Sequence, residues 1–360
     1  MMEDHKRMYR AEFTKRPDAI AIIEQMTKTI KREEKNIRAS YAVSTAWILP
    51  YIFVELILND SIFIAEFILR LYENRGKIGD LIVDNDFYTS TVLDDLKLLE
   101  NQIPYFCLKE LLNPIIERFF GPDDQNLDQV FLELFSVDMV ITEPITFNHF
   151  TDLFRCVYVK SLGDNLHLNN LNDPILVMKN ADKLSSVGVE FKGVELPYSL
   201  NVTYEEGCLT IPSFQADEAS NVIVRNIIAY EQCHDPERAF TTNYICFMNY
   251  LITSDKDVEI LATSEVLTNG VGGSRMVLKT MNNLCTGVQI SPQTQYQDVI
   301  KNLNTHYKSR RNRRLTRLRK VYFSDTWTTT ATVAAIFLLL VTLLGTVAAV
   351  FQAMGVKMRV

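Results

Sequence analysis

The sequence of 360 residues is poor in the residue types that mark small or irregular folds. Its 13 glycines and 11 prolines are too few for a collagen-like or low-complexity chain. Its six cysteines exclude a small disulfide-dense scaffold, and they lack the CxxC spacing of a zinc or thioredoxin-like site. We interpret all six as small buried apolar side chains: Cys107, Cys156, Cys208, Cys233, Cys246 and Cys285.

The signatures of common catalytic sites are also missing. The five histidines form no HExxH motif. Gly270, Gly272 and Gly273 lack both the lysine of a phosphate-binding loop and the last glycine of a dinucleotide-binding turn. Cys233 and His234 are neighbours, but adjacent helical residues point about 100° apart, so they predict no preformed nucleophile and base. We therefore expect no catalytic residue, no cofactor and no metal site.

Charge is distributed unevenly along the chain. Residues 1–307 contain 27 basic and 43 acidic residues, a formal charge of −16, and Asp325 is the only acid after them. An acidic body lacks the positive field that sequence-independent nucleic-acid binding needs, so we expect no nucleic-acid partner. The exception is one run of eight basic residues: Lys308, Arg310, Arg311, Arg313, Arg314, Arg317, Arg319 and Lys320.

A long apolar segment follows this basic run. Residues 328–351 contain no charged side chain, and at about 1.5 Å per residue they can cross a bilayer core of roughly 30 Å. Tyr322, Phe323 and Trp327 stand where interfacial aromatic residues are found. The segment therefore predicts a transmembrane helix, and the alternative is a buried core helix. Small residues four apart would allow a homodimer through the span: Ala331 with Ala335, and Gly345 with Ala349.

The charges beside the span predict its orientation. No apolar run opens the chain, so we expect no secretory signal peptide. Eight basic residues precede the span and two follow it, so the positive-inside rule places residues 1–307 in the cytosol. The basic run is interpreted as a topology determinant. The same residues can also contact anionic lipid headgroups, and each contact would contribute about 1 kcal/mol of binding free energy. We expect a single-pass protein of the plasma membrane or an endomembrane, with a juxtamembrane segment 308–327 and a tail 352–360.

The body 1–307 has the sequence pattern of a mainly α fold. Helical spacing of apolar residues predicts a long, mostly exposed helix or a helix pair over residues 4–40. The apolar stretch 47–72 predicts a buried core helix broken near Asn59-Asp60. The Asn- and Asp-rich stretch 161–173 predicts a loop between two sub-regions. Alternation of apolar and polar residues over 199–212 predicts an antiparallel β-hairpin whose two strands are joined by a three-residue loop, 205–207. Residues 187–192 predict a third strand, which would make the hairpin a meander.

One further pattern joins a helix to a proline. Apolar residues from Val92 to Phe106 follow spacings of four and three, which predicts one helix face, and Pro104 should kink that helix at Gln102-Ile103. Glu100, Asn101 and Gln102 stand just before the proline. We favour a structural role in which the Asn101 or Gln102 side chain satisfies backbone groups, and partner binding is the alternative.

Residues 95–106 read DLKLLENQIPYF, which resembles the signature D-L-x-L-L-E-N-Q-I-P-F/Y-F of the plant family called domain of unknown function 247. Three further blocks resemble family motifs in the same order: EDHK at 3–6, RNIIAYEQC at 225–233 and YFSDTW at 322–327. The chain departs from the family pattern at Thr326, where a proline is usual, and in starting at the first of these blocks.

The resemblance implies a plant membrane protein of unassigned biochemistry, and some grass members of the family are associated with self-incompatibility. We therefore predict a membrane-anchored, non-enzymatic recognition protein with an unidentified protein partner. The alternatives are a lipid-contacting scaffold and a membrane-tethered enzyme of an unfamiliar class. The candidate structural or interaction residues are Glu100, Asn101, Gln102, Pro104, Glu231 and Gln232.

Overall fold

The computed structural model describes residues 2–73, 79–121, 126–137, 145–163, 178–196, 198–270, 272–289, 294–309 and 326–353. These residues are mainly helical, with small sheets in the second half, as the sequence predicts. The first region contains α1 Met2–Phe13, α2 Ala19–Ala39, α3 Pro50–Glu73, α4 Asp86–Asp95, η1 Leu99–Asn101, α5 Tyr105–Phe120, α6 Leu127–Leu134 and α7 Phe150–Lys160.

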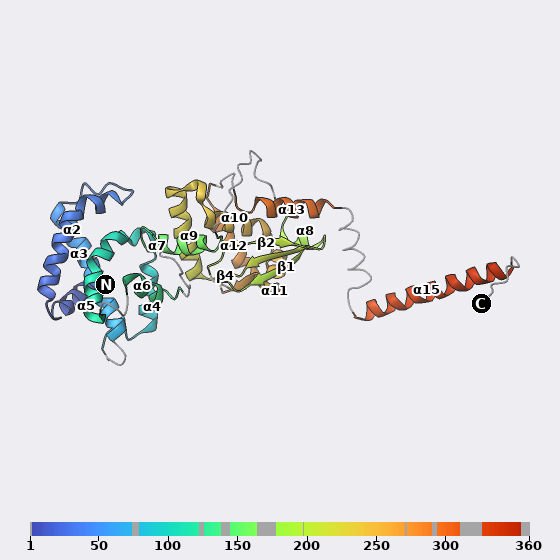
Figure 1. Ribbon diagram of the computed structural model, residues 1–360, viewed down its shortest axis with the longest axis horizontal. Coiled ribbons are helices and arrows are strands. Elements are labelled where there is room, and N and C mark those ends of the chain that lie inside the picture. Colours follow the sequence, from blue (N-terminus) through green and yellow to red (C-terminus); the bar gives the residue numbers. More distant parts are fainter. Residues whose placement is uncertain are drawn as a thin grey trace.

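The second region follows, and Figure 1 shows the two regions side by side. It contains α8 Ala181–Ser185, β1 Glu190–Val194, β2 Thr203–Glu205, β3 Cys208–Pro212, β4 Phe214–Ala216, α9 Glu218–His234, η2 Pro236–Arg238, α10 Phe240–Leu251, α11 Asp255–Thr263, β5 Leu267–Asn269, α12 Ser274–Cys285 and α13 Gln297–Lys308. A last helix, α15 Thr326–Ala353, packs on neither region. Most of the predicted loop 161–173 lies outside the described residues.

Of the two alternatives predicted for the N-terminus, a long helix or a helix pair, the structure has the pair, α1 and α2. α3 is one continuous helix, so the predicted break is wrong. At the expected break, Lys6 of α1 pairs with Asp60 at 2.6 Å, and Arg10 donates to the Asn59 side chain. Because α1 supplies cations to these polar positions, α3 can continue through them while its other face stays buried.

The single kinked helix predicted over residues 92–106 is also wrong. α4 ends at Asp95, a 3₁₀ turn follows, and α5 begins at Tyr105 with Pro104 as its N-terminal cap residue. Proline disfavours helical backbone in the residue before it, and the chain is extended already at Gln102, with φ −110° and ψ 137°. The proline therefore separates two helices instead of bending one.

The hairpin is confirmed, and its details differ from the prediction. β2 and β3 pair antiparallel through a two-residue loop, Glu206 and Gly207, whose φ angles are 50° and 90°. Two positive φ angles give the turn that matches the twist of the strands, so a third loop residue is not needed. The added strand β1 pairs with β3 and runs parallel to it, so the sheet order is β1-β3-β2 and the sheet is no meander. β4 and β5 form a second, parallel pair.

Gly193 of β1 passes unusually close to the turn after α11. A Cβ atom at this position would lie 2.0 Å from the carbonyl oxygen of Glu265, and the Gly193 amide donates to Ser264 at 2.6 Å. We predict that Gly193→Ala lowers the free energy of unfolding by about 1–3 kcal/mol, since backbone must move to admit the methyl group. Urea denaturation in detergent measures it. Gly273→Ala, where a Cβ meets nothing within 4 Å, is the control, and an equal loss in both would contradict the account.

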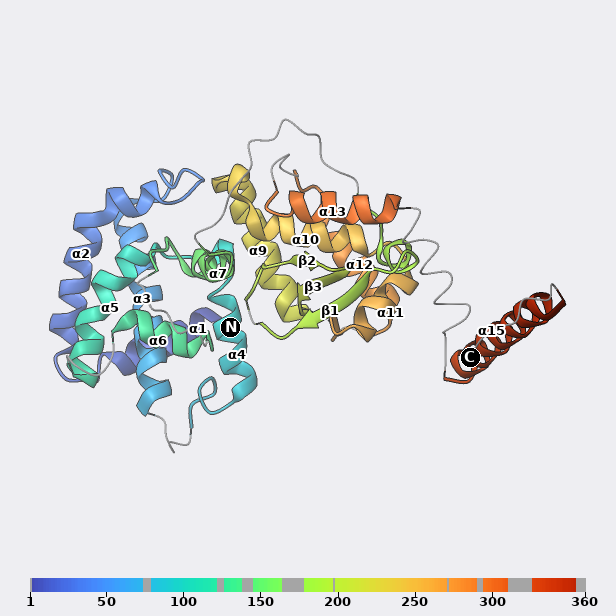
Figure 2. The same ribbon diagram turned by 45° about the vertical axis from the view of Figure 1, so that its right-hand side comes forward.

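Two hydrophobic cores share α9. The first core collects apolar side chains from α1 to α7 and also Ile227, whereas the second contains the strands, α10 to α13, Val224 and Ile228. Ile227 and Ile228 are adjacent on α9 and point about 100° apart, so each enters a different core. Figure 2 shows α9 at the boundary, between α7 and the strands. This helix therefore joins the two regions.

Candidate functional site at the junction of the two cores

The Gln102 side chain stabilises the conformation of the chain between α4 and α5. Its side-chain amide donates to the carbonyl oxygens of Leu96 at 2.8 Å and Leu98 at 2.5 Å. Its side-chain oxygen accepts from the backbone amide of Phe150 at 2.9 Å, at the start of α7. One side chain thus satisfies three backbone groups of two segments. These contacts are of the kind that the favoured structural role of Gln102 predicts.

The neighbours of Gln102 have different roles. Asn101 donates to the carbonyl oxygen of Asp95 at 3.0 Å, across the same turn, whereas Glu100 is exposed. Pro104 is buried and caps α5, and the amide of Tyr105 after it donates to Asn148 at 2.7 Å. Asn101, Gln102 and Pro104 therefore shape this segment, and Glu100 is the residue that faces solvent.

Asn226 connects this segment to α9. Its side-chain oxygen accepts from the backbone amide of Leu99 at 2.8 Å, and its amide donates to Val222 of its own helix at 2.8 Å. The two residues are 127 positions apart in the chain. The sequence blocks 95–106 and 225–233, singled out separately, thus meet at the junction of the cores.

Replacing Asn226 by alanine tests this link. The Leu99 amide would lose its acceptor, and we expect the free energy of unfolding to fall by about 1–2 kcal/mol. Asn226→Asp keeps the accepting oxygen and loses the donor to Val222, so it should retain the larger part of the stability. Urea denaturation of the two variants side by side measures the difference, and an Asp variant that is no better than the Ala variant would argue against the Leu99 bond.

Tyr230, one helical turn after Asn226, is the centre of a ring cluster. Its hydroxyl accepts from the Asn148 side chain at 3.0 Å. His149 contacts the ring edge-on at 4.6 Å between centroids, and His234 stacks on it at 4.9 Å. The Arg155 guanidinium lies 5.9 Å from the same ring centroid. The cluster binds the start of α7 to the end of α9.

Burial shifts the pKa values of two groups beside this cluster, His149 and Cys156, and an ion pair of a buried carboxylate lies between them in the sequence. Asp152 is 2% exposed, accepts from Arg155 at 2.7 Å and from the Asn148 backbone at 2.9 Å. Burial lowers the pKa of His149, whose ring nitrogen accepts from the amide of Asp152 as a helix cap. Burial also raises the pKa of the Cys156 thiol to about 12. At neutral pH this thiol stays protonated, which makes it a poor nucleophile.

The next two residues of α9 point into the second region. Glu231 is 2% exposed and accepts from the amides of Thr241 at 3.1 Å and Thr242 at 2.8 Å, and from the Thr242 hydroxyl at 2.6 Å. These amides belong to the first turn of α10, whose cap residue Ala239 has no side-chain oxygen. Gln232 accepts from the amide of Gln289 at 2.9 Å. Glu231 therefore caps a helix across space, and burial raises its pKa.

The family model DUF247, described as plant protein of unknown function, matches residues 1–341. The chain belongs to this family. The UPF0481 protein At3g47200 of Arabidopsis thaliana is 23% identical over 368 residues, which cover 92% of this chain and 75% of that protein. The putative UPF0481 protein At3g02645 of the same plant is 25% identical over 179 residues, 49% of this chain and 34% of that protein. No solved structure matches the chain significantly.

The C-terminal helix of this DUF247 protein is long and apolar enough to cross a membrane. Within α15, an 18-residue window of the segment Trp327–Val350 has a mean hydropathy of 2.7, and none of that window is buried against the rest of the described structure. The described structure therefore shows no burial of this window of the kind that a core helix would have. Lys308, at the end of α13, is exposed, and the other seven residues of the basic run lie outside the described residues.

Exposed apolar side chains gather before and within the first turns of α3, where the sequence predicted a buried helix. Trp47 is 80% exposed and Tyr51 is 70% exposed. The set, called here the 43–56 apolar surface, is Val43, Trp47, Leu49, Tyr51, Ile52 and Leu56. Grouped exposed apolar residues of this size mark interaction surfaces more often than scattered ones do. Sequence periodicity missed it because both faces of this segment are apolar.

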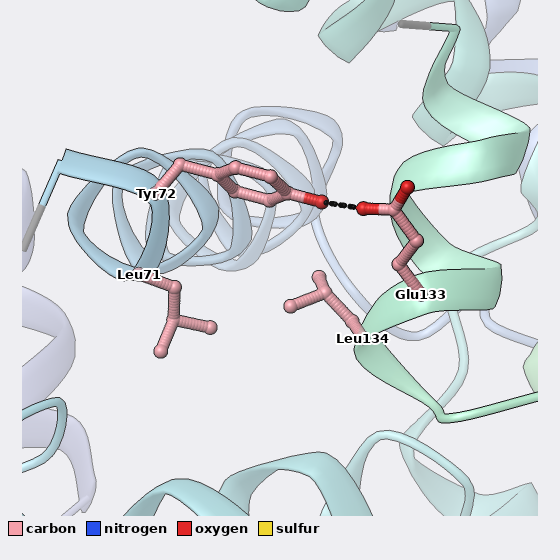
Figure 3. A pocket seen from close by; sticks show the side chains of 4 residues that line it. All are labelled: Leu71, Tyr72, Glu133 and Leu134. Atoms are coloured by element: carbon pink, nitrogen blue, oxygen red, sulfur yellow. Dashed lines mark hydrogen bonds between the residues drawn. The ribbon is translucent and has the colours of Figure 1, made fainter. Parts of the chain in front are cut away.

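Two hollows of the first region lie away from the junction. One, of about 270 Å³, lies between α3 and α6, and Figure 3 shows the Tyr72 hydroxyl pointing at the Glu133 carboxylate across it, 2.7 Å apart. The other, of about 430 Å³, lies between α2 and α5 beside Pro114. Two of its lining residues form ion pairs, Arg118 with Asp18 and Glu110 with Arg32. Neither hollow receives a residue of the predicted site.

Four of the six cysteines depart from the expected burial. Cys107 and Cys246 are buried as predicted, but Cys233 is exposed at the end of α9, and the remaining three are partly buried. All six are free thiols. Cys233 precedes His234, whose ring is stacked on Tyr230, so this histidine is engaged with its own helix.

Proposed function

We propose that this DUF247 protein is a membrane-anchored interaction protein, non-enzymatic, which holds its two-core body at a membrane. The observation that carries the proposal is α15: 24 consecutive residues, Trp327–Val350, expose their apolar side chains and are covered by no other part of the described structure. Exposing such a helix to water is unfavourable by the transfer free energy of every side chain on it, so its stable place is a bilayer.

At the junction of the two cores, the polar side chains that could serve as catalytic groups form hydrogen bonds within the fold, which supports a structural role for them. Gln102 binds three backbone groups, and Glu231 binds the first turn of α10 with both oxygens. These two side chains therefore form their hydrogen bonds within the fold, as structural residues do. The 43–56 apolar surface offers a protein partner a place to bury apolar side chains. Recognition of the self-incompatibility type is the finer form of this proposal.

The orientation proposed for the anchor puts the body in the cytosol, at the plasma membrane or an endomembrane. Its support is the charge difference across the span, with eight basic residues before it and two after it. In that orientation the basic run 308–320 lies beside anionic headgroups and adds electrostatic attraction. Ala331, Ala335, Gly345 and Ala349 would let two spans pack as a homodimer.

Topology is the test. Three aliquots of plant microsomes that hold the full-length protein are treated separately: sealed vesicles with protease, solubilised protein with glycosidase, and the third by extraction at alkaline pH. We expect the protein to remain in the alkali-resistant pellet, the body to be digested and no glycosidase shift to occur. Asn201, in the sequence Asn201-Val202-Thr203, is exposed and reports the other orientation. A protected body with a glycan on Asn201 would reverse the orientation, and release by alkali would overturn the anchor.

A further inference from the structure

Two cysteines of the second core face each other across two helices. Cys246 lies in the middle of α10 and is 5% exposed, and Cys285 is the last residue of α12 and partly buried. Their sulfur atoms are 4.0 Å apart, with the Cys285 thiol donating to the Cys246 sulfur. Cys285 also contacts the carbonyl oxygen of Ile245 at 3.8 Å. No zinc-type spacing or cluster of further ligands accompanies the pair within the described part of the chain.

We propose that Cys246 and Cys285 are a modification site at which peroxide forms a disulfide bond that joins α10 to α12. A disulfide needs sulfur atoms about 2.05 Å apart, so each sulfur has to move by about 1 Å. Side-chain rotation supplies such a movement, and the helices are already packed against each other. The proposal is independent of the membrane anchor and of the proposed function.

The chemistry balances with one peroxide molecule. A thiolate attacks one peroxide oxygen, the O–O bond breaks, and hydroxide leaves as the sulfur becomes a sulfenic acid. The second thiolate attacks that sulfur, the S–O bond breaks, and the oxygen leaves as water. Two thiols and one hydrogen peroxide thus give one disulfide and two waters, and the two sulfurs lose the two electrons that peroxide gains.

The environment favours Cys246 as the first nucleophile. The hydrogen bond from the Cys285 thiol lowers the pKa of Cys246, whereas the same bond raises the pKa of Cys285. Cys285, at the end of its helix, is then in contact to resolve the sulfenic acid. The bond would close a loop that contains α11 and β5, so it would restrain the second core against unfolding.

The experiment uses the full-length protein in detergent, with and without hydrogen peroxide. After iodoacetamide quenching and digestion, mass spectrometry without reductant should find the Cys246 peptide linked to the Cys285 peptide. Iodoacetamide labelling of both cysteines, measured after denaturation, should fall by roughly tenfold and return with dithiothreitol. The urea midpoint should rise on oxidation and fall back on reduction.

Three variants make the result decisive. Cys285→Ser and Cys246→Ser should each lose the linked peptide and the reversible shift in urea midpoint. Cys233→Ser removes the exposed cysteine of α9 and should keep both. If Cys246→Ser fails to fold, Cys285→Ser, at a helix end, carries the test alone. Sulfinic acids at the two positions without the link, or a disulfide through Cys233 instead, would overturn the proposal.

Discussion

Glu231→Ala is expected to lower the free energy of unfolding by about 3–5 kcal/mol, the largest effect of any single substitution proposed for this chain. The change leaves two amides and a hydroxyl of the first turn of α10 without an acceptor. Thr241 and Thr242 are each 1% exposed, so water cannot replace the carboxylate. Ala239 offers no side-chain oxygen in its place. Urea denaturation in detergent measures the loss.

Glu237→Ala is the matched control, since Glu237 is exposed a few residues further along the chain. It should change the free energy of unfolding by less than about 0.5 kcal/mol. If both variants lose the same amount, or if Glu231→Ala is neutral, the carboxylate does not cap α10.

A pH dependence follows from the same carboxylate. Burial raises the pKa of Glu231 above its ordinary value of 4.5, so the folded state binds the proton more tightly than the unfolded chain does. The stabilisation from that proton is complete below about pH 4.5 and is lost as the pH rises through the raised pKa. We therefore expect the free energy of unfolding, taken relative to Glu231→Gln, to decrease over this window and then stay constant. A difference that increases with pH would contradict the sign.

Gln102→Ala is expected to lower the free energy of unfolding by about 2–4 kcal/mol. The amide of Phe150 would lose its acceptor, and the carbonyl oxygens of Leu96 and Leu98 would lose their donor. Because these groups lie just after α4 and at the start of α7, the chain between α4 and α5 and the start of α7 would loosen together. Thermal denaturation followed by circular dichroism, and urea denaturation, both report it.

The residues beside Gln102 supply the controls. Glu100→Ala changes an exposed side chain and should stay within about 0.5 kcal/mol, and Asn101→Ala, with one bond to Asp95, should cost about 1 kcal/mol. Gln102→Glu keeps the acceptor for Phe150 but removes the donors to the two carbonyls, so it should fall well below wild type. A Glu variant as stable as wild type would show that the carbonyl contacts contribute nothing.

Local patterns in the sequence predicted much of this fold. The apolar run predicted a helix over residues 328–351, which lies within α15, and helical spacing predicted helical structure where α1 and α2 lie. Alternation predicted the β2–β3 hairpin. The structural role of Gln102 could be inferred because a proline two residues later disturbs the backbone groups nearby. Each of these inferences depends on residues that lie within a few positions of one another.

The remaining features depend on contacts between distant residues. Nothing near Glu231 in the sequence shows that α10 begins with an alanine cap that this carboxylate completes. α3 stays continuous at Asp60 because Lys6 of another helix pairs with it. β1 pairs parallel with β3, and Asn226 reaches Leu99 across 127 residues. Periodicity reports which face of an element is apolar, and it does not report which element covers that face.

The sharing of α9 between the two cores has a consequence for cooperativity. Two separate cores ordinarily melt as two units, each with its own enthalpy. Here Ile227 completes one core and Ile228 the other, so neither can unravel around α9 without exposing apolar surface of its neighbour. The body should therefore unfold in a single calorimetric peak whose van't Hoff and calorimetric enthalpies agree. For the same reason, a partner that binds one core should stabilise both cores against unfolding.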